Sequence, residues 1–198
     1  MKRLSTSLII CLSLVPMLNN GCTYYVSKKY PTCGYKELQP AEKKPLLLHF
    51  EYRTNGKYNK SFTKSHKVKF MLILQESGLF SSVKFVDGPN TSSTPRMDIV
   101  FNEKLDQGKT FVKGLITGLT FFILGSNVTS NYEFEGTYTQ TGMTPVSFDY
   151  NHALSLNMGL IVPKQDGIVR DYSDEAVDHI AMDLTVHLLK DLQHAGYL

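Results

Sequence analysis

The sequence lacks tryptophan and has only three cysteines among its 198 residues. It also lacks the local signatures of several enzyme classes: there is no HExxH, no GxSxG, no glycine-rich phosphate loop and no CxxC pair. These absences exclude enzymes that depend on such motifs. We therefore expect a protein that is not an enzyme and that needs no cofactor. The alternative is an enzyme whose catalytic group is assembled only in space, which leaves no local trace in the sequence.

An excess of either charge is also missing. The net charge is +3, and two of the basic residues, Lys2 and Arg3, lie at the extreme N-terminus. Such a balance gives no electrostatic reason for nucleic-acid binding. No apolar run reaches the roughly 20 residues that a membrane-spanning helix needs. The length suits one domain with a hydrophobic core.

The N-terminus has the order of a bacterial export signal. A basic start is followed by an apolar run from Leu8 to Val15, by Pro16 and by the sequence Asn19-Asn20-Gly21-Cys22. A charged region, a short apolar region and a small residue before the cleavage point are what such a signal requires. We interpret residues 1–21 as a signal peptide that is removed.

Gly21-Cys22 resembles the end of the bacterial lipobox, in which the cysteine becomes the mature N-terminus and carries acyl chains. The family prefers leucine three residues before the cysteine, where this chain has Asn19. The resemblance implies a membrane anchor on Cys22. Because Thr23 follows rather than aspartate, it also implies the outer membrane, at its periplasmic face. The alternative is an ordinary cleaved signal and a periplasmic or secreted protein, in which Cys22 is free to pair with Cys33.

Residues 22–45 are polar and basic and contain three prolines, which is typical of a flexible tether. Residues 46–198 are interpreted as a single folded domain. Alternating apolar and polar residues predict strands at 46–52, 83–85, 97–101, 132–138 and 146–156. Apolar residues at helical spacing predict helices at 61–76, with Phe62, Val68, Met71 and Leu72 among its apolar residues, and at 173–194.

Turn residues separate these elements. Asn55-Gly56 and the segment Gln140–Gly142 are turn signals, and Gly78 is a helix stop. The pattern predicts an α+β fold: an antiparallel sheet of about five strands with helices packed on one face. The expected order is β-α-β-β, an apolar segment, then β-β-α.

The stretch Glu76-Ser77-Gly78-Leu79-Phe80-Ser81-Ser82-Val83 is similar to the end of the first helix and the start of the next strand in CsgG-like and TolB N-terminal-like envelope proteins. The resemblance covers about 46–101. It implies β-α-β-β order and an envelope setting, in which some lipoproteins assist outer-membrane transport or regulate cell-wall synthases. It assigns no functional residue.

Gly114 to Tyr132 contains no charged residue. Its apolar centre is about 10 residues long, too short for a membrane span. Simple burial is one interpretation, and contact with a membrane surface or a partner is another. A groove for a lipid is a third. The residues expected to make such a contact are Leu115, Ile116, Leu119, Phe121, Phe122, Ile123 and Leu124.

His179, Asp183 and His187 follow one another at intervals of four residues, which puts them on one stripe of the last predicted helix. That spacing suits a shared metal ion. The stripe also flanks the apolar face, where polar side chains lie in any amphipathic helix. We therefore expect no metal site. The alternative is a bound metal ion, for which these three residues are the candidate ligands. His152 continues the apolar register of its strand and is expected to be a hydrogen-bonded core histidine.

Together these features predict a membrane-anchored envelope lipoprotein that binds or scaffolds another envelope protein. The alternatives are an exported hydrolase without a local motif and a carrier of a lipid or another hydrophobic ligand.

Overall fold

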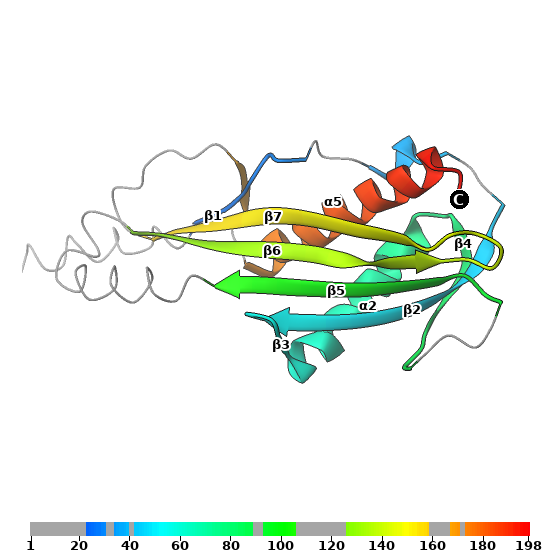
Figure 1. The fold of residues 1–198 in the computed structure, drawn as a ribbon. Helices are drawn as coiled ribbons and strands as arrows, with labels where there is room; N and C mark the ends of the chain where they lie inside the picture. Colours follow the sequence, from blue (N-terminus) through cyan, green and yellow to red (C-terminus); the bar gives the residue numbers. More distant parts are fainter. Residues whose placement is uncertain are drawn as a thin grey trace, which may run out of the picture.

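The computed structural model describes residues 23–30, 34–39, 42–88, 93–105, 126–158, 167–170 and 173–198. In this part of the chain, two helices cover one face of a mixed β-sheet, and both pass behind it in Figure 1. The elements, in chain order, are β1 (Thr23–Val26), a 3-10 helix (Tyr35–Glu37), β2 (Lys44–Thr54), β3 (Lys57–Tyr58), α2 (Lys60–Glu76), β4 (Phe80–Phe85), β5 (Arg96–Leu105), β6 (Ser126–Thr139), β7 (Val146–Met158), β8 (Ile168–Arg170) and α5 (Ser173–His194).

The sheet has eight strands within the described residues, in the order β3-β2-β5-β6-β7-β1-β8, with β4 also paired to β2. Strand β2 runs parallel to both β4 and β5, and the other pairs are antiparallel. The α+β class is therefore found, whereas the antiparallel sheet of about five strands is wrong, and the predicted order lacks β1, β3 and β8. The physical reason is the crossover through α2, which returns the chain to the starting end of β2, so that β4 begins beside it.

Local signals fix the ends of α2. The turn between β2 and β3 places Asn55 and Gly56 at positive φ (51° and 77°), as a two-residue hairpin requires. The Asn59 side chain then caps the helix by accepting a hydrogen bond from the Phe62 N–H at 3.2 Å. At the other end Gly78, at φ 73°, releases the chain toward β4. The predicted turn and the predicted helix stop are both confirmed.

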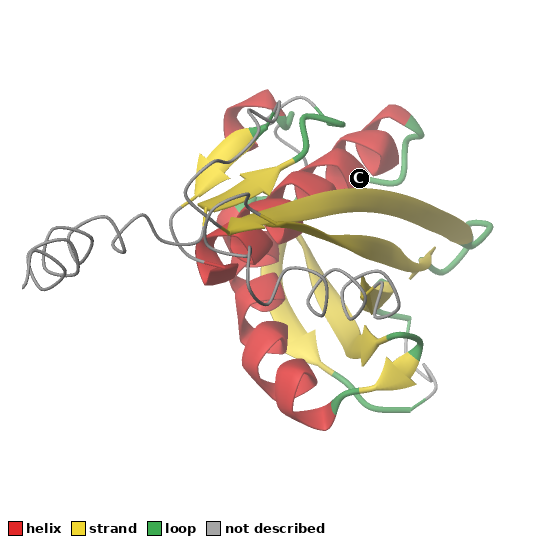
Figure 2. Ribbon diagram, turned by 90° about the vertical axis from the view of Figure 1, so that its left-hand side faces the viewer, coloured by secondary structure: helices red, strands yellow, loops and turns green. Residues whose placement is uncertain are grey.

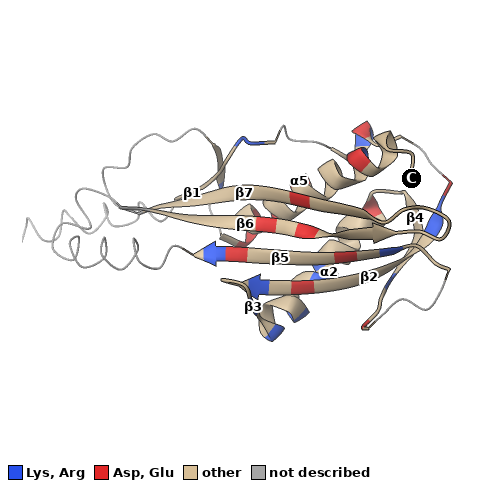
Figure 3. Ribbon diagram, in the orientation of Figure 1, with Lys and Arg blue, Asp and Glu red and all other residues tan. Residues whose placement is uncertain are grey.

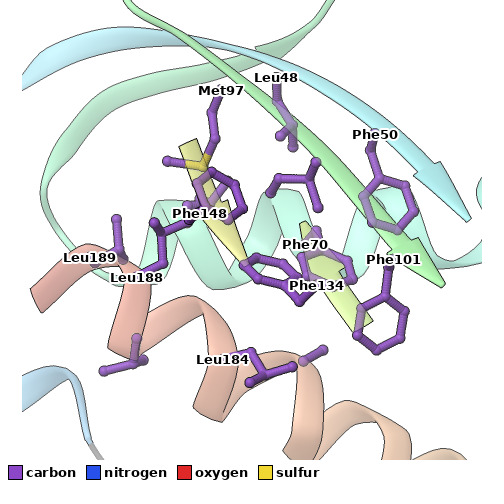
Figure 4. Packing of buried hydrophobic residues seen from close by; sticks show 14 of the residues in the cluster. Leu48, Phe50, Phe70, Met97, Phe101, Phe134, Phe148, Leu184, Leu188 and Leu189 are labelled. Atoms are coloured by element: carbon purple, nitrogen blue, oxygen red, sulfur yellow. The ribbon is translucent and has the colours of Figure 1, made fainter. Parts of the chain in front are cut away.

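Alternation along the strands brings apolar side chains to the face that the helices cover. Leu46, Leu48, Phe50 and Tyr52 of β2 are all buried, as predicted. The centre of the core is aromatic, and Figure 4 shows these rings between the sheet and the two helices. The stacked or edge-on rings are those of Phe70, Phe101, Phe134 and Phe148.

Helix α5 has the predicted bounds, Ser173–His194, and the predicted apolar face. Ile180, Leu184, Leu188 and Leu192 are at most 1% exposed. Full burial of a leucine or isoleucine side chain contributes about 1.5–3 kcal/mol, so this face fixes the helix against β1, β7 and α2. Figure 2 shows the two helices on the same side of the sheet.

The apolar face predicted for α2 is wrong. Phe62, Val68 and Leu72 are 46%, 44% and 45% exposed, and the buried residues are Thr63, Phe70 and Leu74. Helical spacing predicted the helix itself correctly, but it did not predict which face of the helix is buried. The rotation of the helix about its axis was decided by Phe70 and Leu74, which meet the aromatic core.

The predicted tether at 22–45 differs from the structure. Thr23–Val26 is strand β1 and pairs with β7 and β8, and Val26 is 0% exposed. Further along, the Gln39 N–H donates to Gln193 Oε1 at 3.0 Å. The folded domain therefore includes residues that the sequence assigned to a tether, because their partners lie more than 100 residues away. Residues 1–21 and Cys22 are outside the described residues.

Candidate functional site

The candidate site lies on the outer edge of β2, in the gap between β3 and β4. Both short strands pair with that same edge: β4 pairs with residues up to Leu48, and β3 begins to pair at Arg53. Helix α2 runs alongside the residues between these two points (Figure 1). The sheet edge is therefore interrupted in its middle, and the helix forms one wall of the interruption.

Hydrogen bonds close this edge at its two ends. The Val86 N–H donates to the Leu48 carbonyl at 3.0 Å, and the Tyr52 N–H donates to Thr63 Oγ1 at 2.9 Å. Successive residues of a strand point their backbone groups to opposite edges, so the Phe50 N–H and C=O face the gap between these two bonds. They have no hydrogen-bond partner on this edge among the described residues.

The gap contains a cavity of about 510 Å³. Its apolar lining comes from Leu48, Phe50, Phe85 and Val86, and the exposed ring of Tyr58 stands at its margin. This volume falls within the range of ligand pockets, roughly 300–1,000 Å³. We call this cavity and its lining residues the β2-edge groove.

Lys60, Lys64 and Lys67 of α2 line the groove on its helical side. Their spacing of four and three residues puts them on one face of the helix. Within the described residues none of the three has an ion-pair partner, although Lys67 Nζ lies 5.0 Å from the centre of the Phe85 ring. By contrast Lys69, on another face of α2, contacts Asp178 at 2.6 Å.

Two carboxylates also line the groove, and they do not balance the lysines. Glu51 is already paired, with its Oε2 accepting a hydrogen bond from Arg53 Nη2 at 2.7 Å. Asp87 is exposed after the end of β4. The α2 N-terminus adds the positive end of the helix dipole to the same region, and its first turn has no acidic residue. The groove therefore carries an excess of positive potential.

The open face of the sheet differs from the groove, because the ion pairs found there satisfy acids and bases on neighbouring positions. Figure 3 shows acidic and basic residues together on β2 and β5, and acidic residues alone on β6 and β7. The pairs are Arg53 with Glu51, Arg96 with Asp98, and Lys104 with Glu133. Glu135 of β6 and Asp149 of β7 lie opposite each other, are exposed and have no ion-pair partner among the described residues, so the uncompensated charge on this face is negative.

The predicted histidine stripe lies on the opposite flank of the molecule. His179 Nε2 is 3.3 Å from Asp183 Oδ2, and both side chains are largely buried, at 13% and 3% exposed. Arg170 Nη2 lies 3.3 Å from His179 Nδ1. Burial raises the pKa of the Asp183 carboxyl and lowers the pKa of His179. The third member, His187, contacts the Tyr30 ring at 5.0 Å between ring centres.

These residues do not form a metal centre in the described part of the chain, where no group of three or more histidine, cysteine, aspartate or glutamate side chains has a metal-binding arrangement. His152 is 2% exposed, and its Nδ1 lies 3.3 Å from Ser27 Oγ. Its Nε2 has no hydrogen-bond partner among the described residues. The prediction of a core histidine is therefore correct for its burial and only half correct for its hydrogen bonding.

Cys22 and the apolar set from Leu115 to Leu124 lie outside the described residues. Among the helices that are described, none is long and apolar enough to cross a bilayer. The β2-edge groove itself was not predicted. The spacing of its lysines in the helix was visible in the sequence, but the gap in the sheet edge was not.

No protein-family model and no curated protein matches this chain, so the resemblance to CsgG-like and TolB N-terminal-like proteins remains a prediction. Two solved structures show a distant likeness at 12% identity. One is a neuraminyllactose-binding hemagglutinin homolog from Helicobacter pylori, with a TM-score of 0.39 over 85% of this chain and 91% of that one. The other is the rare lipoprotein B from Shewanella oneidensis, with a TM-score of 0.33 over 75% and 95%.

Proposed function

We propose that this protein is a cell-envelope lipoprotein with a non-catalytic binding or scaffolding role, held at a membrane by acyl chains on Cys22. The signal-like order of residues 1–22 supports the anchor. Each buried methylene of an acyl chain contributes about 0.8 kcal/mol, so several chains give stable attachment. The partner in this proposal is another envelope protein.

One observation carries the proposal from sequence to structure: Thr23, the residue after Cys22, lies at the same end of the sheet as the two strand ends that flank residues 106–125. Thr23 pairs with Asn157 of β7, which pairs in turn with Asn127 of β6. Strand β5 ends close by, where Leu105 pairs with Ser130. In Figure 1 these strand ends lie together at the left of the sheet.

An anchor on Cys22 would therefore hold this end of the sheet against the bilayer. Because β1 begins at Thr23, no tether separates the folded domain from the anchor. The chain between Leu105 and Ser126 contains the predicted contact residues, and it starts and finishes at the same end. This supports the proposal that Leu115 to Leu124 contact the membrane surface as a second attachment.

The location follows from the same proposal. The absence of aspartate after Cys22 favours the outer membrane, with the domain at the periplasmic face. A periplasmic or secreted protein without an anchor is the competing outcome.

Replacement of Cys22 tests the anchor. Globomycin blocks cleavage of lipoprotein signals, so the native precursor should accumulate in treated cells. We expect Cys22→Ser to move the protein out of the membrane fraction, whereas the matched variant Cys33→Ser should fractionate like the native chain. If Cys22→Ser alters neither maturation nor fractionation, the lipoprotein proposal is wrong.

A second pair of variants tests the apolar contact. Phe121→Asp combined with Phe122→Asp should weaken the binding of the unacylated Cys22→Ser chain to vesicles. The matched change, Thr141→Asp in the exposed β6–β7 turn, should not. Equal vesicle binding by both chains would remove Leu115 to Leu124 from the proposal.

A further inference from the structure

The β2-edge groove keeps its positive charge at a cost to the fold. Lys60 is the first residue of α2, where the helix dipole favours a negative side chain and disfavours a positive one. Lys64 follows one turn later, and the two side chains repel each other at this spacing. Elsewhere on the same helix Lys69 is neutralised by Asp178. Charge left uncompensated against the helix dipole points to a use outside folding.

The groove also offers backbone groups, which distinguishes it from a simple basic patch. The Phe50 N–H and C=O face the gap between β3 and β4, without a partner on that edge among the described residues. An extended chain laid against a sheet edge satisfies such groups with its own amide and carbonyl. Beside them, the half-buried ring of Phe85 and the exposed ring of Tyr58 provide apolar surface for a side chain.

We infer that the β2-edge groove binds an acidic, extended segment of another protein. One residue of that segment pairs with the Phe50 backbone, and its neighbouring carboxylates contact Lys60 and Lys64. An apolar side chain of the segment rests on Phe85 or Tyr58. This inference rests on the proposed binding function and names the chemistry of the partner.

The position of the groove favours a protein over the lipid surface. Phe50 pairs with Ile99, which is six residues before the end of β5 at Leu105. Across the sheet, Phe50 is level with Phe148 of β7, nine residues before Asn157, which pairs with Thr23. At about 3.3 Å per residue, the groove lies roughly 30 Å along the sheet from Thr23. A bilayer held at that end would therefore not contact the groove, which would face the space away from the membrane surface.

Peptide binding tests the inference on the full mature chain in detergent. The probe is a labelled heptapeptide that alternates glutamate with phenylalanine or valine, and the matched probe has lysine in place of each glutamate. Fluorescence anisotropy should show saturable binding of the acidic probe and none of the basic probe. In a parallel assay without detergent, vesicles of phosphatidylglycerol added at equal charge should not displace the acidic probe from the unacylated Cys22→Ser chain.

Charge reversal identifies the site. Lys64→Glu should weaken binding of the acidic probe about 10-fold or more, because a charge-assisted contact becomes repulsive. Lys84→Glu is the matched control, since Lys84 is an exposed lysine of the neighbouring strand that does not line the groove. It should change the affinity less than about 2-fold, within the range of a remote surface charge.

Stability separates loss of the site from loss of the fold. Lys60→Glu should weaken binding of the acidic probe as Lys64→Glu does. Its urea unfolding midpoint should nevertheless stay equal to or above that of the native chain, because glutamate interacts favourably with the dipole at the helix N-terminus. No binding of the acidic probe to the native chain would overturn the inference. Displacement by the lipid vesicles, or equal losses in Lys64→Glu and Lys84→Glu, would also overturn it. The unacylated Cys22→Ser chain should bind the probe normally, so failure of the anchor and failure of the groove give different results.

Discussion

Truncation of Val26 tests whether the residues directly after Cys22 belong to the folded domain. The Val26 side chain is 0% exposed, in a strand held between β7 and β8. Val26→Ala removes two methyl groups, which corresponds to about 1.6 kcal/mol at about 0.8 kcal/mol per buried carbon. The cavity left behind adds to this loss. We expect the free energy of unfolding to fall by about 2–3 kcal/mol.

Urea unfolding followed by far-ultraviolet circular dichroism measures this change. Val169→Ala is a matched control on the adjacent strand β8, because Val169 is 50% exposed. Its effect should stay within about 0.5 kcal/mol, as for other surface substitutions. If Val26→Ala is as mild as Val169→Ala, residues 23–26 form a tether after all. The domain would then stand away from its anchor.

Three further outcomes follow from the packing and the buried polar groups. Gly136→Ala should lower the free energy of unfolding by more than the usual 1–3 kcal/mol of overpacking. The reason is that the new Cβ would lie 1.8 Å from a backbone carbonyl oxygen of β5. Gly34→Ala, whose Cβ would meet nothing within 4 Å, should be nearly neutral in the same urea assay. Burial lowers the pKa of His152 and His179, so the unfolded chain takes up protons first as the pH falls. The free energy of unfolding should therefore decrease below about pH 6.5, and a profile that is flat between about pH 7.5 and about pH 5.5 would contradict this. Glu103→Gln should lower the free energy of unfolding by about 1–3 kcal/mol and with it the thermal midpoint, because the carboxylate accepts hydrogen bonds from two buried tyrosine hydroxyls. An unchanged midpoint would count against that hydrogen-bond network.

Much of the framework could be read from local patterns. The bounds of α5, the hairpin of β6 and β7, and the buried face of β2 depend on periodicity within one segment. Glycine and asparagine at the turn of Asn55 and Gly56 require a backbone conformation that few other residues adopt. Such features need no knowledge of the rest of the chain.

Features that depend on distant partners could not be read in this way. Thr23–Val26 is a strand because β7 and β8 lie on either side of it, and its four residues carry no clear alternation. The direction of β2 relative to β5 leaves no mark on periodicity. The exposure of Val68 and Leu72 depends on how α2 is rotated against the core.

The candidate site divides along the same line. His179 and Asp183 meet because helical spacing brings them together, and their contact was foreseeable. The basic face of α2 was visible as Lys60, Lys64 and Lys67. The β2-edge groove exists only because β3 and β4 stop short of each other on one strand edge, which is a tertiary fact.

Intact-mass and peptide mass spectrometry of the protein isolated from its own membrane tests the central claim most directly. The account predicts a mature chain that begins at Cys22, carries acyl chains on that residue and contains Cys33 as an unlinked thiol. A chain that begins elsewhere, or one in which Cys22 is unmodified or disulfide-bonded to Cys33, would contradict it.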